Sequence, residues 1–202
     1  MINVYYNNKK IEKEGQFLTP EETALQPVIS FLPLKPLNTN NSNYYTLILY
    51  DPNSVRAPNY VHWTVINIIL NKNNMIFIGN QINDDVNQGN NLIQYQGPSP
   101  PVNSGMHNYT FLMYKQDKIY GPEFIRSIDT NNRNYKYLMD KLNLNSNNKL
   151  ISKTYFTSRY TGETGGKKIV KERYNFKQRK TIKKQKKINK TIKNKKNNKK
   201  KQ

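Results

Sequence analysis

The sequence predicts a mostly β protein, an antiparallel sandwich of two sheets with Greek-key connections and a few peripheral helices. Three observations favour this fold class. Short runs of apolar, aromatic and β-branched residues recur along the chain, and they are too short for buried helices. Turns rich in Asn, Pro and Gly separate these runs at roughly even spacing. Few segments have apolar residues at helical spacing.

The first part of the chain, from Met1 to about Leu25, is mixed and polar. Within it, residues 19–22 (TPEE) resemble a helix start, with a capping Thr, proline at the first helical position and acids in the first turn. An Asn/Ser turn is expected at 38–43, a Pro-punctuated loop at 51–60 and a polar loop at 84–91. The strands expected between these segments are residues 27–32, 44–50, 62–69 and 75–78.

The second part of the chain is organised around a loop at residues 97–109. Three prolines and two glycines forbid regular structure there, so the loop is expected to be rigid and of fixed shape. An apolar stretch at 92–95 leads into it, and a strand at 109–115 follows it. The rest is expected to be an irregular segment at 117–132, a helix at 135–142 and a last strand at 153–158.

Composition excludes several classes of site. The 202 residues include no cysteine, which rules out disulfides, thiolate metal sites and cysteine nucleophiles. The two histidines and scattered carboxylates do not form the cluster that a catalytic metal needs, so we expect no metal and no cofactor. No apolar leader follows Met1 and no apolar run reaches membrane-spanning length, which favours a soluble, cytoplasmic protein.

The net charge of +20 is concentrated near the C-terminus. Residues 167–202 carry 18 Lys or Arg and one Glu, a charge of +17, whereas residues 1–166 carry +3. We therefore expect a globular domain at 1–166, with a flexible joint at 161–166, and a Lys-rich disordered tail at 167–202.

Three interpretations of this tail stay open. It could bind nucleic acid or an anionic membrane surface, it could act as a nuclear address through the run at 183–187, or it could be a solvated tail without a partner. If it binds polyanions, deleting 167–202 should abolish that binding. Few aromatic residues are interleaved with the lysines, so sequence-selective base stacking is not expected.

Polar residues at strand ends form a candidate site. Asp51 ends one predicted strand and His62 begins the next, so both can lie at the same end of one sheet. His107 opens a third strand, two residues before Tyr109. An imidazole, a phenol and several backbone N–H groups on one loop suit a small anion such as phosphate. Each residue also has a plainer interpretation: a turn former for Asp51, a surface or packing role for the histidines, a core position for Tyr109.

Two linked motifs resemble the signature regions of the phosphatidylethanolamine-binding protein family, which includes Raf-kinase-inhibitor and flowering-locus relatives. The first is residues 45–53 (YTLILYDPN) followed by 62–67 (HWTVIN). The second is residues 97–109 (GPSPPVNSGMHNY), similar to the loop G-x-x-P-P-x-x-x-G-x-H-R-[YF]. Their order and the gap between them also agree, and the resemblance covers about residues 25–160.

The resemblance implies a pair of antiparallel sheets and a small pocket for phosphate, phosphoryl head groups or acetate. It places six residues at the pocket, Ser99 being at the rim: Asp51, His62, Ser99, Pro101, His107 and Tyr109. The two imidazoles and the phenol could donate hydrogen bonds to anionic oxygens, and the carboxylate could orient an imidazole. The expected function is a non-enzymatic binding module that regulates a kinase or protease. If both histidines face the pocket, anion binding should tighten as pH falls through the histidine range.

The sequence departs from the family pattern at four positions. Asn53 and Val55 replace an acid and a proline in the first motif, and Ser99 replaces a common glycine. Asn108 stands where the family nearly always has an arginine that braces the two motifs. A hydrolase is the weakest alternative, because no nucleophile lies in a setting such as G-x-S-x-G.

Overall fold

The computed structural model describes residues 1–31, 44–55, 57–69, 76–78, 89–146 and 149–162. The predicted turn at 38–43 and the tail at 167–202 lie outside them, as do most of the loop predicted at 84–91 and of the joint predicted at 161–166.

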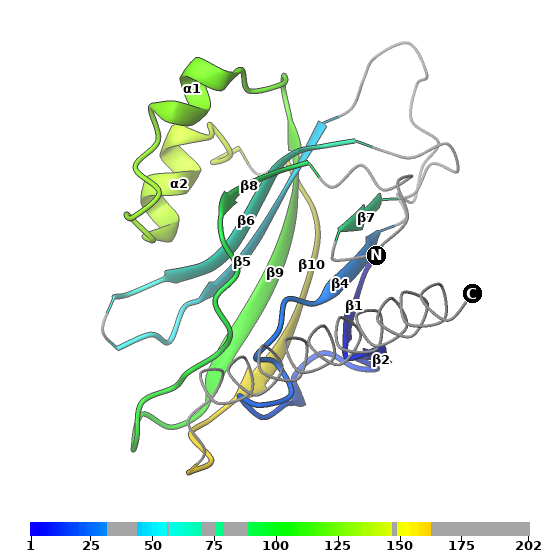
Figure 1. The fold of residues 1–202 in the computed structure, drawn as a ribbon, viewed down its shortest axis with the longest axis vertical. Helices are drawn as coiled ribbons and strands as arrows, with labels where there is room; N and C mark the ends of the chain where they lie inside the picture. The colour runs from blue at the N-terminus through cyan, green and yellow to red at the C-terminus, as the bar shows by residue number, and fades with distance from the viewer. Residues whose placement is uncertain (32–43, 56, 70–75, 79–88, 147–148, 163–202) are drawn as a thin grey trace, which may run out of the picture. The chain divides into compact units, whose positions relative to one another are not determined.

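The described chain forms two β-sheets and two short helices (Figure 1). The four-stranded sheet has the order β2-β1-β4-β7: Lys9–Lys10, Ile2–Tyr6, Val28–Phe31 and Ile76–Ile78. The six-stranded sheet has the order β3-β10-β9-β5-β6-β8: Gln16–Phe17, Leu150–Ser158, His107–Gln116, Tyr44–Asp51, Tyr60–Ile68 and Asn90–Ile93. The helices are α1, Pro122–Arg126, and α2, Tyr135–Lys141.

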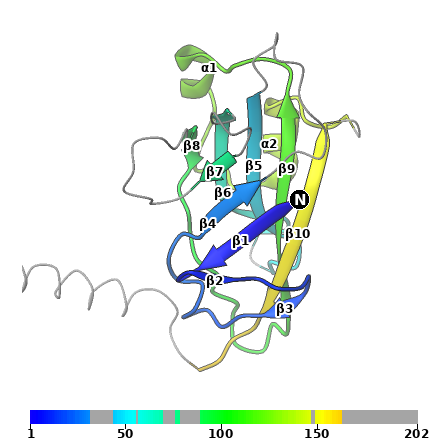
Figure 2. The same ribbon diagram turned by 90° about the vertical axis from the view of Figure 1, so that its right-hand side faces the viewer.

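The six-stranded sheet lies between the smaller sheet and the helices (Figures 1 and 2). Its inner face packs against β1 and β4 in one apolar cluster, and its other face packs against α2 and the segments around it in a second. This explains why nearly every residue of β5 is buried whereas burial alternates along β1. A strand covered on both faces needs a continuous apolar run, and one covered on a single face needs an alternating one.

The prediction of a mostly β, two-sheet fold is confirmed, and the structure adds to it at the N-terminus. β1 was not predicted, although Ile2, Val4 and Tyr6 are buried on one face of it. The pairing is also not wholly antiparallel, since β3 runs parallel to β10, with Gln16 opposite Phe156. A two-residue edge strand has too little pattern to reveal its direction from sequence.

The helix predicted from residue 19 is wrong, although its capping contacts form. The Thr19 N–H donates to the Glu22 carboxylate at 2.9 Å, and the Glu22 N–H donates to Thr19 Oγ1 at 3.2 Å. Residues 20–25 nevertheless form turns. Pro27 disfavours helical backbone at the residue before it, so too few positions remain to extend the first turn. Conversely, α1 lies in a segment predicted to be irregular; Pro122 at its start was the missed signal.

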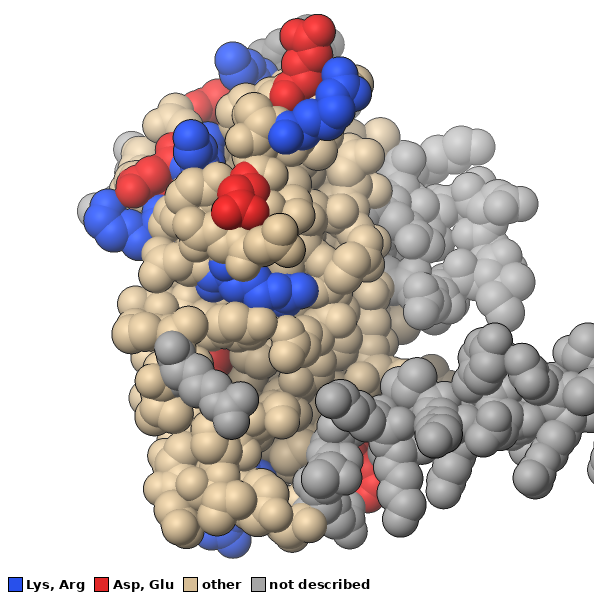
Figure 3. Space-filling view, turned by 60° about the vertical axis from the view of Figure 1, so that its left-hand side comes forward, with Lys and Arg blue, Asp and Glu red and all other residues tan. Residues whose placement is uncertain are grey.

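The helical end of the molecule carries charged side chains of both signs (Figure 3). One pair is Lys136 with Asp140 at 2.9 Å, an exposed i,i+4 pair on α2. None of the helices in the described part of the chain is long and apolar enough to cross a membrane.

Candidate functional site

A pocket of about 200 Å³ opens where β5 ends and β6 and β9 begin. All six residues that the sequence nominated line it, and four further residues join them. The full lining is Asp51, Ser54, Tyr60, His62, Gln96, Ser99, Pro100, Pro101, His107 and Tyr109.

Strand pairing brings these distant segments together. β5 pairs with β6 so that Asp51 lies opposite Tyr60, and it pairs with β9 so that Tyr50 lies opposite Thr110. Because both pairings are antiparallel, the end of β5 and the starts of its two neighbours share one edge of the sheet. Successive side chains of a strand alternate between faces, so Tyr60 and His62 point to the same side.

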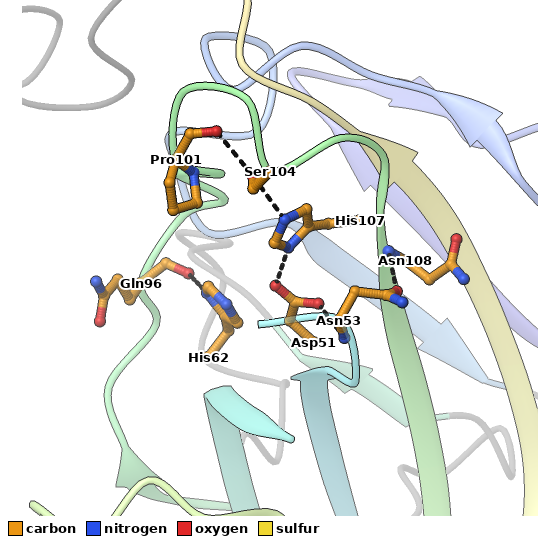
Figure 4. Close-up of polar contacts among 8 residues, drawn as sticks. All are labelled: Asp51, Asn53, His62, Gln96, Pro101, Ser104, His107 and Asn108. Carbon is orange, nitrogen blue, oxygen red and sulfur yellow. Dashed lines mark hydrogen bonds and ion pairs between the residues drawn. The ribbon is translucent and has the colours of Figure 1, made fainter. Parts of the chain in front are cut away.

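Asp51 and His107 form a buried ion pair at the centre of the pocket wall (Figure 4). The His107 Nδ1 lies 2.7 Å from Asp51 Oδ2, and the two residues are 1% and 3% exposed. On the other side of the ring, Nε2 lies 2.9 Å from Ser104 Oγ. The Ser104 hydroxyl in turn donates to the Pro101 carbonyl at 2.7 Å.

This chain of contacts fixes where the protons lie. A carbonyl oxygen can only accept, so the single hydroxyl proton of Ser104 is directed to Pro101. The Ser104 oxygen must then accept from Nε2, while Nδ1 donates to the Asp51 carboxylate. Both ring nitrogens of His107 are therefore donors, and both are used within the protein. The expectation that this imidazole donates directly to a ligand does not fit these contacts.

His62 has the opposite character. Its Nδ1 lies 2.8 Å from the Gln96 carbonyl oxygen, so Nδ1 carries a proton and donates (Figure 4). Burial lowers the pKa of His62 to about 4. The hydrogen bond to Gln96 and the charge of Asp51 oppose this shift, and the Arg133 and His107 cations reinforce it. The ring is thus neutral between pH 6 and pH 8. The predicted tightening of anion binding in that range cannot come from protonation of His62.

Tyr109 contributes a phenol to the pocket. Its ring stacks on Phe156 at 5.2 Å between centroids and meets His62 edge-on at 5.1 Å. Burial, followed by the nearby Asp51 and Tyr95, raises the pKa of Tyr109 far above its ordinary value, so the hydroxyl keeps its proton. A backbone hydrogen bond at Ser99 acts in the other direction.

Among the titratable side chains of the pocket, the groups left for a ligand are an O–H donor on Tyr109 and a lone pair on His62 Nε2. No hydrogen bond joins that nitrogen to the rest of the described chain. The hydroxyls of Ser54 and Ser99 and the side-chain amide of Gln96 also line the pocket. No three His, Asp or Glu side chains of the described residues lie close enough together to hold a metal ion. The arrangement suits a small polar group with acidic oxygens.

Comparison with known proteins agrees with the two motifs. A sequence profile of the phosphatidylethanolamine-binding protein family matches residues 6–170. The chain belongs to this family. Among related sequences, a Drosophila melanogaster protein named as an odorant-binding protein (A5) is 26% identical over 125 residues, 59% of this chain and 50% of that protein. A 26 kDa secreted antigen of Toxocara canis is 31% identical over 120 residues, 57% of this chain and 38% of the antigen. The chain thus spans half or less of the length of these two relatives.

Solved structures give the same fold. A carboxypeptidase Y inhibitor in complex with its cognate proteinase has a TM-score of 0.59 at 19% identity, over 79% of this chain and 83% of that one. A phosphatidylethanolamine-binding protein from Plasmodium vivax has a TM-score of 0.51 at 18% identity, over 79% and 85% of the two chains. At these identities the likeness establishes the fold.

Two departures from the family motif compensate for each other in this chain. The Asn53 N–H donates to Asp51 Oδ1 at 2.8 Å, and the Asn53 side-chain oxygen accepts from the Asn108 N–H at 3.0 Å (Figure 4). Asn53 therefore joins the first motif to the second, the connection that the resemblance assigned to an arginine at position 108. Val55 is 63% exposed and does not shape the pocket.

Besides Ser54 and Pro100, sequence reasoning missed three residues of this site. Tyr60 could have been found from its i,i+2 spacing to His62, and Ser104 from its place in the motif loop. Gln96 could not have been found from the sequence. It fixes the tautomer of His62 through its backbone carbonyl, and any residue at this position would supply one. Arg133 lies behind the pocket, where its guanidinium donates to the carbonyls of Val61 and Gln94 at 3.1 and 3.3 Å.

The lowered pKa of His62 predicts a loss of stability in mild acid. An unfolded histidine titrates near pH 6.5, and the folded one near 4. As pH falls between these values only the unfolded state takes up the proton, so the free energy of unfolding decreases. The full decrease from this histidine is about 3 kcal/mol. Urea unfolding of the wild type and His62→Gln at pH 7.5 and pH 4.5 measures it: the wild type should lose more stability, whereas equal losses would contradict the pKa.

Proposed function

We propose that this chain is a non-enzymatic binding module whose pocket holds a phosphate or phosphoryl group. The observation that carries the proposal is the gathering of Asp51, His62, His107 and Tyr109 in one small, partly enclosed pocket. The proline-rich loop supports it, since a rigid wall avoids an ordering cost on binding. Membership of a family described by phosphatidylethanolamine binding points to a ligand that carries a phosphoryl group.

The hydrogen bonds also support a binding role over hydrolysis. Asp51, His107 and Ser104 follow one another in the order of a carboxylate, an imidazole and a hydroxyl, as in a serine hydrolase. A nucleophilic serine must give its proton to the imidazole. Here the Ser104 hydroxyl donates away from the ring, to Pro101, and the ring donates to it. The imidazole is therefore not available as a general base.

Titration of the full chain with inorganic phosphate, followed by NMR, tests the proposal. We expect shifts of the His62 and Tyr109 ring signals that saturate with phosphate concentration. Tyr109→Phe should weaken binding about tenfold or more, because it removes a hydrogen bond to a charged group. Tyr5→Phe, on β1 and outside the pocket lining, is the matched control and should bind like the wild type. Unmoved pocket signals, or equal weakening by both variants, would refute the proposal.

Three finer expectations stay predictions. Regulation of a kinase or protease rests on family resemblance, since the likeness to the carboxypeptidase Y inhibitor is one of fold. A cytoplasmic location is a prediction from the sequence. The division into a domain at 1–166 and a tail at 167–202 that contacts nucleic acid or anionic membrane rests on the +17 charge of that segment.

A further inference from the structure

The titratable side chains of the pocket offer a ligand one donor and one acceptor rather than two cationic donors. His62 is held in a single tautomer by the Gln96 carbonyl oxygen, 2.8 Å from Nδ1. Its second nitrogen can then only accept. Tyr109, whose ring lies at 78° to the same imidazole with the centroids 5.1 Å apart, keeps its hydroxyl proton and can donate.

Rotation of the His62 ring that would exchange its donor and acceptor nitrogens is disfavoured. The ring is 5% exposed and lies edge-on to two aromatic rings, Tyr60 and Tyr109, both with centroids at 5.1 Å. Turning it over would remove the N–H from the Gln96 carbonyl and leave that buried acceptor without its hydrogen bond. The acceptor nitrogen is therefore a stable feature of the pocket.

The polar and charged groups around His62 do not offer a ligand oxygen the hydrogen-bond donor that Nε2 lacks. Asp51 is paired with His107 at 2.7 Å, and both N–H groups of His107 are used on Asp51 and Ser104. The Tyr60 hydroxyl donates to Gln96 Oε1 at 2.8 Å. The Arg133 guanidinium faces backbone carbonyls and the Tyr60 ring. An anionic oxygen without a proton, placed next to His62 Nε2, would repel it, because both atoms are hydrogen-bond acceptors and neither carries a hydrogen.

We infer that the pocket selects a phosphoryl group that carries its own proton, with its P–OH donating to His62 Nε2 and an anionic oxygen accepting from the Tyr109 hydroxyl. This rests on the proposed function and names the chemical class within it. Hydrogen phosphate and the monoanion of a phosphomonoester have such a proton. Sulfate and phosphodiesters, which are fully ionised at neutral pH, do not.

The inference predicts a particular pH dependence for each anion. A phosphomonoester loses its second proton with a pKa near 6, so its affinity should fall by about tenfold per pH unit above that value. Inorganic phosphate retains a P–OH at both pH 6 and pH 8, so its affinity should change much less. Sulfate should bind at least about tenfold more weakly than phosphate at pH 7, because the acceptor would be left unsatisfied.

Calorimetric titration of the full chain with inorganic phosphate, ethyl phosphate, dimethyl phosphate and sulfate at pH 6 and pH 8 tests this. The expected result is binding of phosphate at both values, binding of ethyl phosphate that weakens from pH 6 to pH 8, and weak binding of the other two. Equal binding of sulfate and phosphate would overturn the inference and leave the proposed function standing. Absence of phosphate binding would overturn the proposed function itself.

The location of the proton has its own readout. The ¹⁵N shift of His62 Nε2 should stay in the range of an unprotonated nitrogen in the phosphate complex, displaced by an accepted hydrogen bond. A move to the protonated range would place the proton on the ring and contradict the inference. His62→Gln offers an amide N–H to any oxyanion and should reduce the preference for phosphate over sulfate towards one. If that variant does not fold, the wild-type anion series still decides.

Discussion

Replacing Asp51 with Asn is expected to lower the free energy of unfolding by about 3–5 kcal/mol. The carboxylate is 3% exposed, pairs with His107 Nδ1 at 2.7 Å and accepts from the Asn53 N–H at 2.8 Å. Removing its charge leaves a buried imidazole with both nitrogens in donor geometry and no counter-ion. Urea unfolding at pH 7 measures the loss.

A double-mutant cycle separates the ion pair from other effects of the substitution. Asp51→Asn combined with His107→Gln removes both charges, so the double variant should lose less than the sum of the two single variants. Additive losses would show that the pair contributes nothing to stability beyond packing.

Replacing Phe156 with Ala is expected to cost about 3–5 kcal/mol and also to weaken phosphate binding. Phe156 is fully buried in β10, stacks on Tyr109 at 5.2 Å and contacts Tyr6 edge-on at 5.6 Å. The cavity left by the ring would lie directly behind the phenol that forms one wall of the pocket. Tyr109 would lose the surface that holds its hydroxyl in place.

Phe156→Leu is the matched control, because it keeps most of the apolar volume. It should cost less in unfolding free energy and leave phosphate affinity closer to that of the wild type. Stability is read from urea unfolding and affinity from calorimetry under conditions where each variant is folded. A Phe156→Ala variant that binds phosphate as tightly as the wild type would show that Tyr109 does not depend on this stacking.

The central strands of the fold could be predicted because their sequences leave little choice. β5 has a continuous run of aromatic and β-branched residues, and both its faces are covered in the structure. The loop after β8 is irregular as predicted, and its glycines show why. A Cβ on Gly97 would lie 2.9 Å from the Thr23 carbonyl oxygen, and Gly105 has a φ of +80°. Such positions exclude most other residues.

The elements that were missed or wrong have weaker local signals. The capping box at Thr19 and Glu22 formed as the sequence suggested, but a cap does not by itself sustain a helix. The parallel pairing of β3 with β10 depends on a partner about 140 residues away along the chain. No local pattern encodes such a pairing, because it is decided by which edge of the sheet the N-terminal segment reaches.

By itself the sequence determined the β class and the limits of the strands that carry the pocket, because residue type and spacing report which face of a strand is buried and where a strand must stop. The six side chains of the pocket were nominated by the resemblance of its two motifs to the family signatures. Only the tertiary structure decided what those side chains offer a ligand. A backbone carbonyl at Gln96 turns His62 into an acceptor, and a hydroxyl at Ser104 occupies His107. Hydrogen-bond direction depends on partners that folding brings together, and that is why two histidines expected to be alike have opposite roles.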